Sequence, residues 1–454
     1  MTEWLYDRLR GFRDRTALIF DEKVYSYRDL LAEIERYQEV FESENIHEGD
    51  VIVIIGETTP ATIFLLVSLL FRRCIVVPLS GGLSPGQEQE AVEATFAKGA
   101  FRQTLESDGF TYTMCTPKGS HPLLDQLKGQ HSSGLVIFTS GSTSKAKAAL
   151  LSGNRLVGKY EQLDPKKALR VIIFLKIDHI GGINTLLSSI CQGGAIITPR
   201  DRSPKTIAES IETQKVELLP TTPTFLQMLV LSGLHKAYDF SSLKMITYGA
   251  EPMPESTLER VQEAFPGVRL KQTYGLTELG IFPTRSKDSA STWMQVGGDH
   301  VKTKIVDGIL WIKSNMAMLG YLNAPSPFDD EGWFNTGDHV ETNGSYLRIM
   351  GRGEEIINVG GENVYPAEVE SVLMEISNIY EVVVRGKKNP VTGQVVTATC
   401  VLNAPEELAS LRRRISAHCR GRLEQYKIPL LVSISETIAV SDRYKKIRLG
   451  GSEG

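Results

Sequence analysis

Apolar runs alternate with amphipathic stretches through much of the first half of the chain. Val51–Ile55 is entirely apolar, residues 58–71 have the composition of a buried helix, and residues 74–79 form the next apolar run. Strands that are apolar on both faces and alternate with helices are typical of parallel sheets covered by helices on both sides. The pattern therefore predicts an α/β fold.

The same alternation begins earlier and returns later. Two short strands and a long amphipathic helix are predicted before the first apolar run, at residues 16–20, 23–27 and 27–42. Further along, strands and helices are predicted in alternation at residues 170–175, 182–191, 195–198, 204–213 and 216–220. We expect residues 1–350 to form one large domain with one or two helix-covered, mainly parallel sheets.

The pattern changes after residue 306. Short strands with Gly and Asn turns predict an antiparallel β segment there, and a second, smaller module begins near Gly351. Within this module we expect strands at residues 356–358, 380–384 and 395–401, and helices at residues 366–376 and 405–423. The module is therefore predicted to be a separate α+β domain.

Charge and composition narrow the class of protein. Lys and Arg total 50 and Asp and Glu total 54, so the formal charge of −4 gives no reason to expect nucleic-acid binding. The apolar run at residues 61–71 is too short to cross a bilayer, and the N-terminus has no signal-peptide pattern. We therefore expect a cytoplasmic protein without membrane insertion. The five scattered cysteines indicate neither a disulfide framework nor a zinc site.

A loop rich in hydroxyl side chains joins two predicted strands at residues 135–151. It contains Gly141 and ends with Lys147. Backbone N–H groups and Ser or Thr hydroxyls in such a loop can bind phosphate oxygens while the lysine adds positive charge. It is not a Walker A loop, because Ala148 rather than Ser or Thr follows Lys147. A polar hairpin turn without a ligand is the alternative.

Two more segments carry candidate chemistry in the middle of the chain. Residues 245–248 predict a strand that runs into a Gly249-Ala250 turn, and ligands bind at the carboxyl ends of strands in open α/β sheets. An ordinary strand-to-helix turn is the alternative. Downstream, Glu278 follows a Gly-containing turn. Its carboxylate is a candidate ligand for a Mg²⁺ ion beside a triphosphate.

The third segment contains Asp338 directly after Gly337, and Arg352 at the start of a Gly-rich stretch. An aspartate in this setting can accept hydrogen bonds from both hydroxyls of a ribose, and a nearby arginine can reinforce it.

With these segments in this order, the chain resembles the adenylate-forming superfamily, which includes acyl-CoA synthetases, the adenylation domains of peptide synthetases and firefly luciferase. The resemblance extends over residues 16–448 and is closest to acyl- and aryl-CoA ligases. It implies a large N-terminal domain over residues 1–350 that holds ATP and the acyl group. It also implies a hinge at residues 351–354, with Glu354 at the hinge position, and a small mobile lid domain over residues 355–454.

The resemblance also implies a set of site residues. Two residues of the phosphate loop depart from the family pattern, because Ser144 replaces Gly and Ala146 replaces Pro. The implied residues are the phosphate loop Thr139, Ser140, Gly141, Ser142, Thr143 and Lys147; the adenine turn Gly249, Ala250, Glu251 and Pro252; the nucleotide and magnesium stretch Thr273, Tyr274, Gly275, Thr277 and Glu278; the ribose contacts Asp338 and Arg352; and the CoA-tunnel loop Gly360 and Gly361.

The family carries a catalytic lysine near its C-terminus, in a Gly-Lys-Ile context. Lys446 precedes Ile447 and is expected to be this lysine, with Lys445 in place of the Gly. A solvated basic tail is the alternative.

The resemblance implies a reaction in two steps. A carboxylate attacks the α-phosphorus of ATP to give an acyl-adenylate and pyrophosphate, and a thiol then displaces AMP. Lys446, the phosphate loop and Mg²⁺ on Glu278 are expected to neutralise charge in the first step. No carrier-protein segment follows the small domain, so we expect the thiol to be free CoA or a separate holo acyl carrier protein.

The acyl pocket is expected to begin at His179, because His179-Ile-Gly-Gly is similar to the His-x-x-Gly of acyl- and aryl-CoA ligases. Ile180 then stands where peptide synthetases carry the Asp that binds an α-amine, which argues against an amino-acid substrate. A register shifted by one residue would put Asp178 there instead. Two other functions stay open: an enzyme that loads a separate carrier protein, and a non-catalytic family member that only binds nucleotide or acyl groups.

Overall fold

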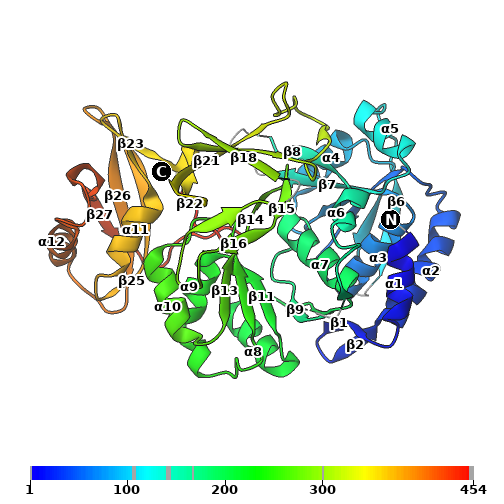
Figure 1. Cartoon of the computed structure of the whole chain (residues 1–454), viewed down its shortest axis with the longest axis horizontal. Coiled ribbons are helices and arrows are strands. Elements are labelled where there is room, and N and C mark those ends of the chain that lie inside the picture. Colours follow the sequence, from blue (N-terminus) through cyan, green and yellow to red (C-terminus); the bar gives the residue numbers. More distant parts are fainter. Residues whose placement is uncertain (1–2, 105–108, 140–144, 166–167, 299–300, 449–454) are drawn as a thin grey trace.

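The computed structural model describes residues 3–104, 109–139, 145–165, 168–298 and 301–448. Within these residues the chain forms two seven-stranded sheets, a six-stranded sheet, a two-stranded ribbon and a five-stranded sheet. In Figure 1 the large domain runs from blue through green to yellow, and the small domain continues through orange to red.

One seven-stranded sheet carries the phosphate-loop segment. Its central strands are parallel, and antiparallel strands close both edges. Loop residues Thr139 and Lys147 face each other where two neighbouring strands end. In spatial order the strands are β20 (Gly320–Tyr321), β8 (Lys147–Ser152), β7 (Gly134–Thr139), β4 (Ile75–Leu79), β3 (Val51–Ile55), β5 (Gly99–Gln103) and β6 (Phe110–Met114).

The second seven-stranded sheet carries the adenine turn. All its pairings are parallel except that of the two edge strands nearest the N-terminus. In spatial order the strands are β13 (Arg269–Gln272), β12 (Met245–Tyr248), β11 (Leu218–Thr221), β9 (Arg170–Ile172), β10 (Ala195–Ile197), β1 (Thr16–Phe20) and β2 (Lys23–Ser26).

An antiparallel sheet links the two domains. Its strands, in spatial order, are β16 (Thr284–Ser286), β17 (Met294–Val296), β22 (Tyr346–Arg352), β21 (Phe334–Asn343), β19 (Ile309–Ser314) and β18 (Val301–Val306). The two-stranded ribbon beside it pairs β14 (Tyr274–Leu276) with β15 (Gly280–Phe282). Strand β22 leads through a 3-10 turn, Gly353–Glu355, into the small domain.

The small domain has its own sheet and its own hydrophobic cluster. Its strands are β23 (Ile357–Val359), β24 (Glu362–Val364), β25 (Ile379–Asn389), β26 (Gly393–Leu402) and β27 (Leu431–Ile434), and its helices are α11 (Pro366–Met374) and α12 (Leu408–Cys419). After β27 the C-terminal segment runs back toward the green strands of the large domain (Figure 1).

Most helices of the large domain begin at capping residues. Ser26 starts a long helix with a capping box, and Thr59 followed by Pro60 starts the apolar one. The helices are α1 (Glu3–Gly11), α2 (Tyr27–Ser43), α3 (Pro60–Phe71), α4 (Pro85–Ala94), α5 (Pro122–Gly129), α6 (Gly153–Gly158), α7 (Ile180–Gln192), α8 (Pro204–Gln214), α9 (Pro223–Leu231) and α10 (Glu255–Ala264).

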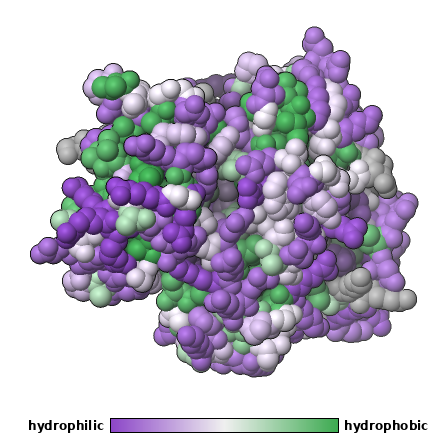
Figure 2. Space-filling view, turned by 60° about the vertical axis from the view of Figure 1, so that its left-hand side comes forward, coloured by the Kyte–Doolittle hydropathy of each residue, from purple (hydrophilic) through white to green (hydrophobic). Residues whose placement is uncertain are grey.

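The predicted fold class is confirmed, with two mainly parallel seven-stranded sheets in the large domain, an antiparallel β segment and a smaller second domain. Some boundaries were wrong: the strand expected at residues 170–175 ends at Ile172, and the helix expected at residues 405–423 spans Leu408–Cys419. In the described part of the chain no helix is long and apolar enough to span a membrane. The face turned forward in Figure 2 is mostly hydrophilic, with separate hydrophobic patches.

Candidate active site

A carboxylate at the end of the linking sheet forms the first element of the site. Asp338 on β21 lies opposite Arg352 on β22, and its Oδ1 accepts a hydrogen bond from Arg352 Nε at 3.1 Å. Its Oδ2 accepts a hydrogen bond from the Tyr274 hydroxyl at 2.6 Å. The Asp338 side chain is only 7% exposed. A buried, fixed carboxylate of this kind is suited to accept hydrogen bonds from ribose hydroxyls.

The electrostatics of this group agree with its burial. Burial and the neighbouring Asp338 carboxylate raise the pKa of Tyr274 well above its usual value. Burial alone would lower the pKa of Arg352, but Asp338, Tyr274 and Glu278 together outweigh it, so the net shift is upward. Tyr274 therefore stays a hydrogen-bond donor and Arg352 stays a cation across the physiological range.

A second carboxylate lies near the first. Glu278 Oε1 accepts a hydrogen bond from the Tyr321 hydroxyl at 2.6 Å, and the Lys147 ammonium lies 5.5 Å from the centre of the Tyr321 ring. Burial and Glu278 raise the pKa of Tyr321. Glu278 also contributes to the raised pKa of Arg352. Its charge therefore acts on the ribose-type group, which consists of Asp338, Arg352 and Tyr274.

Sequence reasoning missed Tyr321. It lies on β20, a two-residue strand that pairs with β8 beside the phosphate loop. Because this pairing is long-range, the sequence around Tyr321 gives no local signal for it.

The donor set around Glu278 fits a magnesium ion that is bound mainly by phosphate oxygens. Among the described residues no cluster of three or more His, Cys, Asp or Glu side chains could hold a metal by itself. Mg²⁺ is usually bound by one or two carboxylates together with substrate phosphates and water. Tyr321 orients one oxygen of the Glu278 carboxylate. Glu278 is thus suited to bind Mg²⁺ together with a nucleotide.

The adenine-type turn is tightly packed. Ala250 has a φ of +72°, a left-handed conformation that is uncommon for a residue with a side chain and is often found at functional sites. A Cβ at Gly249 would lie 2.5 Å from Thr273 Oγ1, so only glycine fits there. Glu251 Oε1 accepts a hydrogen bond from the backbone N–H of Thr224 at 2.8 Å. The turn follows β12 directly, with Pro252 beside it.

The other members of the predicted set occupy nearby positions. Gly275 lies within β14, where an added Cβ would meet the Gly280 carbonyl oxygen at 2.5 Å, and Thr277 follows in the turn before β15. Thr139 ends β7 opposite Lys147. Phosphate-loop residues Ser140, Gly141, Ser142 and Thr143 lie outside the described residues.

His179 begins α7 and caps it. Its Nδ1 accepts a hydrogen bond from the Gly181 N–H at 3.1 Å. Burial lowers the pKa of His179 to about 3, and the positive charges of Lys445 and Arg443 contribute. His179 is therefore neutral, and it lies next to the C-terminal segment.

The two adjacent lysines near the C-terminus lie in different surroundings. The Lys446 side chain is 3% exposed and points into the small domain, where Nζ lies 3.3 Å from Glu370 Oε2 and donates to the Val382 carbonyl at 2.8 Å. Burial lowers the pKa of Lys445, and the charges that act on it include those of Glu251 and Arg352. Lys446 is thus paired within the small domain, whereas Lys445 lies within range of charges from the large domain.

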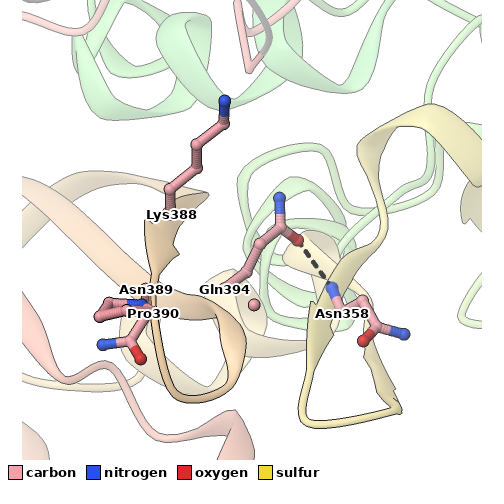
Figure 3. A pocket seen from close by; sticks show the side chains of 6 residues that line it. Asn358, Lys388, Asn389, Pro390 and Gln394 are labelled. Carbon is pink, nitrogen blue, oxygen red and sulfur yellow. Dashed lines mark hydrogen bonds between the residues drawn. The ribbon is translucent and has the colours of Figure 1, made fainter.

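The loop with Gly360 and Gly361 joins β23 to β24, and both glycines have positive φ, +65° and +97°. The loop is exposed, and its N–H groups bond to Thr392 and Asn358 of the small domain. Beside it lies an open pocket of about 490 Å³. Figure 3 shows the hydrogen bond between Asn358 and Gln394 on one side of this pocket and Lys388 extending away from them.

Comparison with known proteins identifies the family. The model of the AMP-binding enzyme family matches residues 5–322, and the model of the AMP-binding enzyme C-terminal domain matches residues 368–439. The chain belongs to the AMP-binding enzyme family. This confirms the predicted family and the predicted class of enzyme, an AMP-forming acid–thiol ligase.

Two CoA ligases match almost the whole chain. An indoleacetate–CoA ligase from Aromatoleum aromaticum is 28% identical and aligns with 94% of this chain and 93% of its own length. A 2-succinylbenzoate–CoA ligase from Bacillus subtilis is 25% identical over 94% of this chain and 92% of its own.

Solved structures share the fold. The anthranilate CoA ligase AuaEII in complex with anthranoyl-AMP superposes with a TM-score of 0.82 at 17% identity, over 98% of this chain and 95% of that one. The o-succinylbenzoate CoA synthetase of Bacillus subtilis in complex with its acyl-adenylate gives 0.78 at 21% identity, over 100% of this chain and 98% of that one.

Proposed function

We propose that this protein activates a carboxylic acid with ATP and transfers the acyl group to CoA. In the first step a carboxylate oxygen attacks the α-phosphorus and the bond to pyrophosphate breaks. In the second step the thiol sulfur attacks the acyl carbon, the bond to AMP breaks, and the thiol proton passes to solvent. The CoA-ligase relatives, which match the chain over nearly its full length, support CoA as the acceptor.

The observation that carries this proposal is a pair of fixed carboxylates whose charges both act on Arg352. Asp338, held by Tyr274 and Arg352, is the ribose anchor. Glu278, held by Tyr321, is the magnesium ligand. Mg²⁺ bound there would neutralise phosphate charge. Each group joins residues that are distant in the sequence, and each carboxylate is oriented by a tyrosine hydroxyl.

We assign the C-terminal catalytic role to Lys445. Its charge interacts with those of Glu251 of the adenine-type turn and Arg352 of the ribose-type group. Burial lowers its pKa, so binding of the negatively charged triphosphate would favour the ammonium form. Lys446 is bound by two partners within the small domain, so its ammonium group is not directed at the nucleotide.

The small domain is proposed to act as the lid, with its hinge at residues 351–354. Arg352 and Glu354 lie where β22 passes into the 3-10 turn that precedes β23. Rotation there would turn Lys445 away from the active site and bring the Gly360 and Gly361 loop to it. We propose that this loop lines the path of the CoA thiol.

The substrate is proposed to be an aryl or medium-chain acyl carboxylate and not an α-amino acid. Ile180 is buried at the start of α7 and offers no charge to an ammonium group. Asp178, the alternative anchor, is mostly buried, which raises its pKa, and the positive charges of Arg443 and Lys176 already act on it. An unpaired ammonium in this region would cost several kcal/mol.

Acid-dependent exchange of labelled pyrophosphate into ATP tests the proposal. A panel of aryl, aliphatic and α-amino acids should give exchange with at least one aryl or aliphatic acid. Asp338→Ala should raise the ATP concentration needed for half-maximal exchange about 10-fold or more, because it removes charge-assisted bonds worth about 1.5–3 kcal/mol each. Glu341→Ala is the matched control on the same strand, because Glu341 is 46% exposed and pairs with Arg348.

Absence of exchange with every acid, while ATP still binds, would replace the proposal by the non-catalytic alternative. An α-amino acid as the best substrate, with loss of activity in Asp178→Ala, would contradict the substrate class.

A further inference from the structure

A half-buried tyrosine of the C-terminal segment packs against the large domain. Tyr444 packs against Phe174 and Phe225, with ring centroids 5.2 and 5.4 Å away, and the Arg202 guanidinium lies 5.3 Å from its ring centroid. Its carbonyl oxygen accepts a hydrogen bond from Thr222 Oγ1 at 2.8 Å. Tyr444 is thus packed against a hydrophobic cluster of the large domain, although it follows the small domain in the sequence.

The backbone at this point is bent in an unusual way. Tyr444 has a φ of +54°, a left-handed conformation that costs free energy for a residue with a bulky side chain. Such a conformation persists only where surrounding contacts hold it, and the Thr222 hydrogen bond and the aromatic contacts supply them. Tyr444 N in turn donates to the Ser441 carbonyl at 2.9 Å, which closes a turn.

The other end of the same segment is fixed to the small domain. Arg448 pairs with Glu370 at 2.9 Å and with Glu355 at 3.2 Å, and Lys446 pairs with the same Glu370. Glu370 is fully buried, and although burial alone would raise its pKa, Arg448 and Lys446 lower it. It is therefore an anion held between two cations.

Lys445 lies between these two attachments. Residue 444 is held by the large domain and residue 446 by the small domain, so the direction of the single residue between them is fixed when both contacts are made. We propose that Tyr444 is a positioning residue, which packs against the contacting rings of Phe174 and Phe225 to hold Lys445 over the nucleotide and withdraws when the small domain rotates. This rests on the proposed function, and it adds the residue that couples domain orientation to the first half-reaction.

The contact makes the two half-reactions separable. Formation of the acyl-adenylate needs Lys445 in place and therefore needs the Tyr444 contact. Transfer to CoA needs the other face of the small domain, so it does not use the Tyr444 contact. Loss of the aromatic ring should slow the first step alone.

The experiment compares Tyr444→Ala with Tyr444→Phe in the full-length protein. Tyr444→Ala should slow acid-dependent pyrophosphate exchange about 30-fold, through kcat more than through the KM for ATP, because two aromatic contacts and a cation–π contact are lost. Tyr444→Phe keeps these contacts and should stay within about 2-fold of the wild-type rate. Thioester formation from supplied acyl-adenylate and CoA should be unchanged in both variants.

A distance measurement tests the same contact without catalysis. Spin labels at Val24→Cys in the large domain and Val391→Cys in the small domain, 60% and 88% exposed, report the domain orientation. Half-buried Cys115 is replaced by serine to avoid a third label. Wild type and Tyr444→Phe should share one main distance, and Tyr444→Ala should add a second population.

Any of three results would overturn the proposal. These are an equal loss in both half-reactions of Tyr444→Ala, an equal defect in Tyr444→Phe, and a Tyr444→Ala distance distribution identical to that of the wild type. Failure of the proposed function gives a different result: wild type itself then shows no exchange with any acid. In that case the spin-label distances still decide whether Tyr444 sets the domain orientation.

Discussion

Replacing Lys445 and Lys446 one at a time by methionine should give two opposite phenotypes. Methionine removes the charge and keeps a long apolar side chain. Lys445→Met should lower the rate of adenylate formation about 10²–10³-fold, the usual cost of removing one preorganised charge-stabilising group from an active site. Because burial lowers the pKa of Lys445, its charge does not stabilise the fold, and the free energy of unfolding should not fall.

Lys446→Met should act on stability instead. Lys446 and Glu370 have side chains that are 3% and 0% exposed, so this ion pair is shielded from solvent. Breaking a buried pair costs about 3–5 kcal/mol. Glu370 keeps Arg448 at 2.9 Å, which places the expected loss near the lower end, at about 3 kcal/mol.

The assay combines urea unfolding with the two half-reactions, measured at a temperature where both variants are folded. Lys446→Met should keep adenylate formation within a few-fold of wild type under these conditions, and thioester formation from supplied acyl-adenylate should survive in both variants. A severe catalytic defect in Lys446→Met with normal stability, together with a mild one in Lys445→Met, would refute the reasoning and restore Lys446 as the catalytic lysine.

Three further changes give distinct results. His179→Asn keeps a good helix cap and removes the titrating group. Between pH 6 and pH 4 the wild type should lose about 2 kcal/mol more unfolding free energy than this variant, because burial lowers the pKa of His179 to about 3 and only the unfolded chain takes up the proton. An equal change in the unfolding free energy of both proteins with pH, measured by urea unfolding, would contradict this. Tyr321→Phe removes the hydroxyl that orients Glu278 and should raise the Mg²⁺ concentration for half-maximal exchange about 10-fold, and an unchanged magnesium titration would remove Glu278 as the metal ligand. Gly361→Leu should slow thioester formation but not pyrophosphate exchange, while Gly344→Leu, at another exposed left-handed glycine, should slow neither; an equal loss of thioester formation in both would point to general strain.

The alternation of apolar runs and helices was enough to predict the α/β class. It worked because strands such as Val51–Ile55 are buried along their whole length, which leaves a continuous apolar run in the sequence. The antiparallel β segment after residue 306 could also be predicted, because its turns contain Gly and Asn. Boundaries were less certain, since Arg170–Ile172 is followed by apolar residues that leave the sheet without a change in composition.

The candidate site was only partly visible. Gly and Asp motifs marked Asp338 and the Gly249 turn because their chemistry depends on local backbone shape. Tyr321 and Tyr444 could not be found this way, because each acts through a partner distant in sequence: Glu278 for the first and Phe174 for the second. The different surroundings of the two adjacent lysines could not be predicted either, since neighbouring side chains point in different directions and only the packing decides where each one lies.

A single-turnover reaction followed by mass spectrometry tests the central claim most directly. The protein, in excess over an aryl or aliphatic acid that supports exchange, is mixed with ATP and Mg²⁺, quenched, and then compared with a sample that also received CoA. The account predicts that acyl-adenylate accumulates without CoA and is converted, mole for mole, to acyl-CoA and AMP when CoA is added. Formation of ADP in place of AMP, or acyl-adenylate that persists in the presence of CoA, would contradict it.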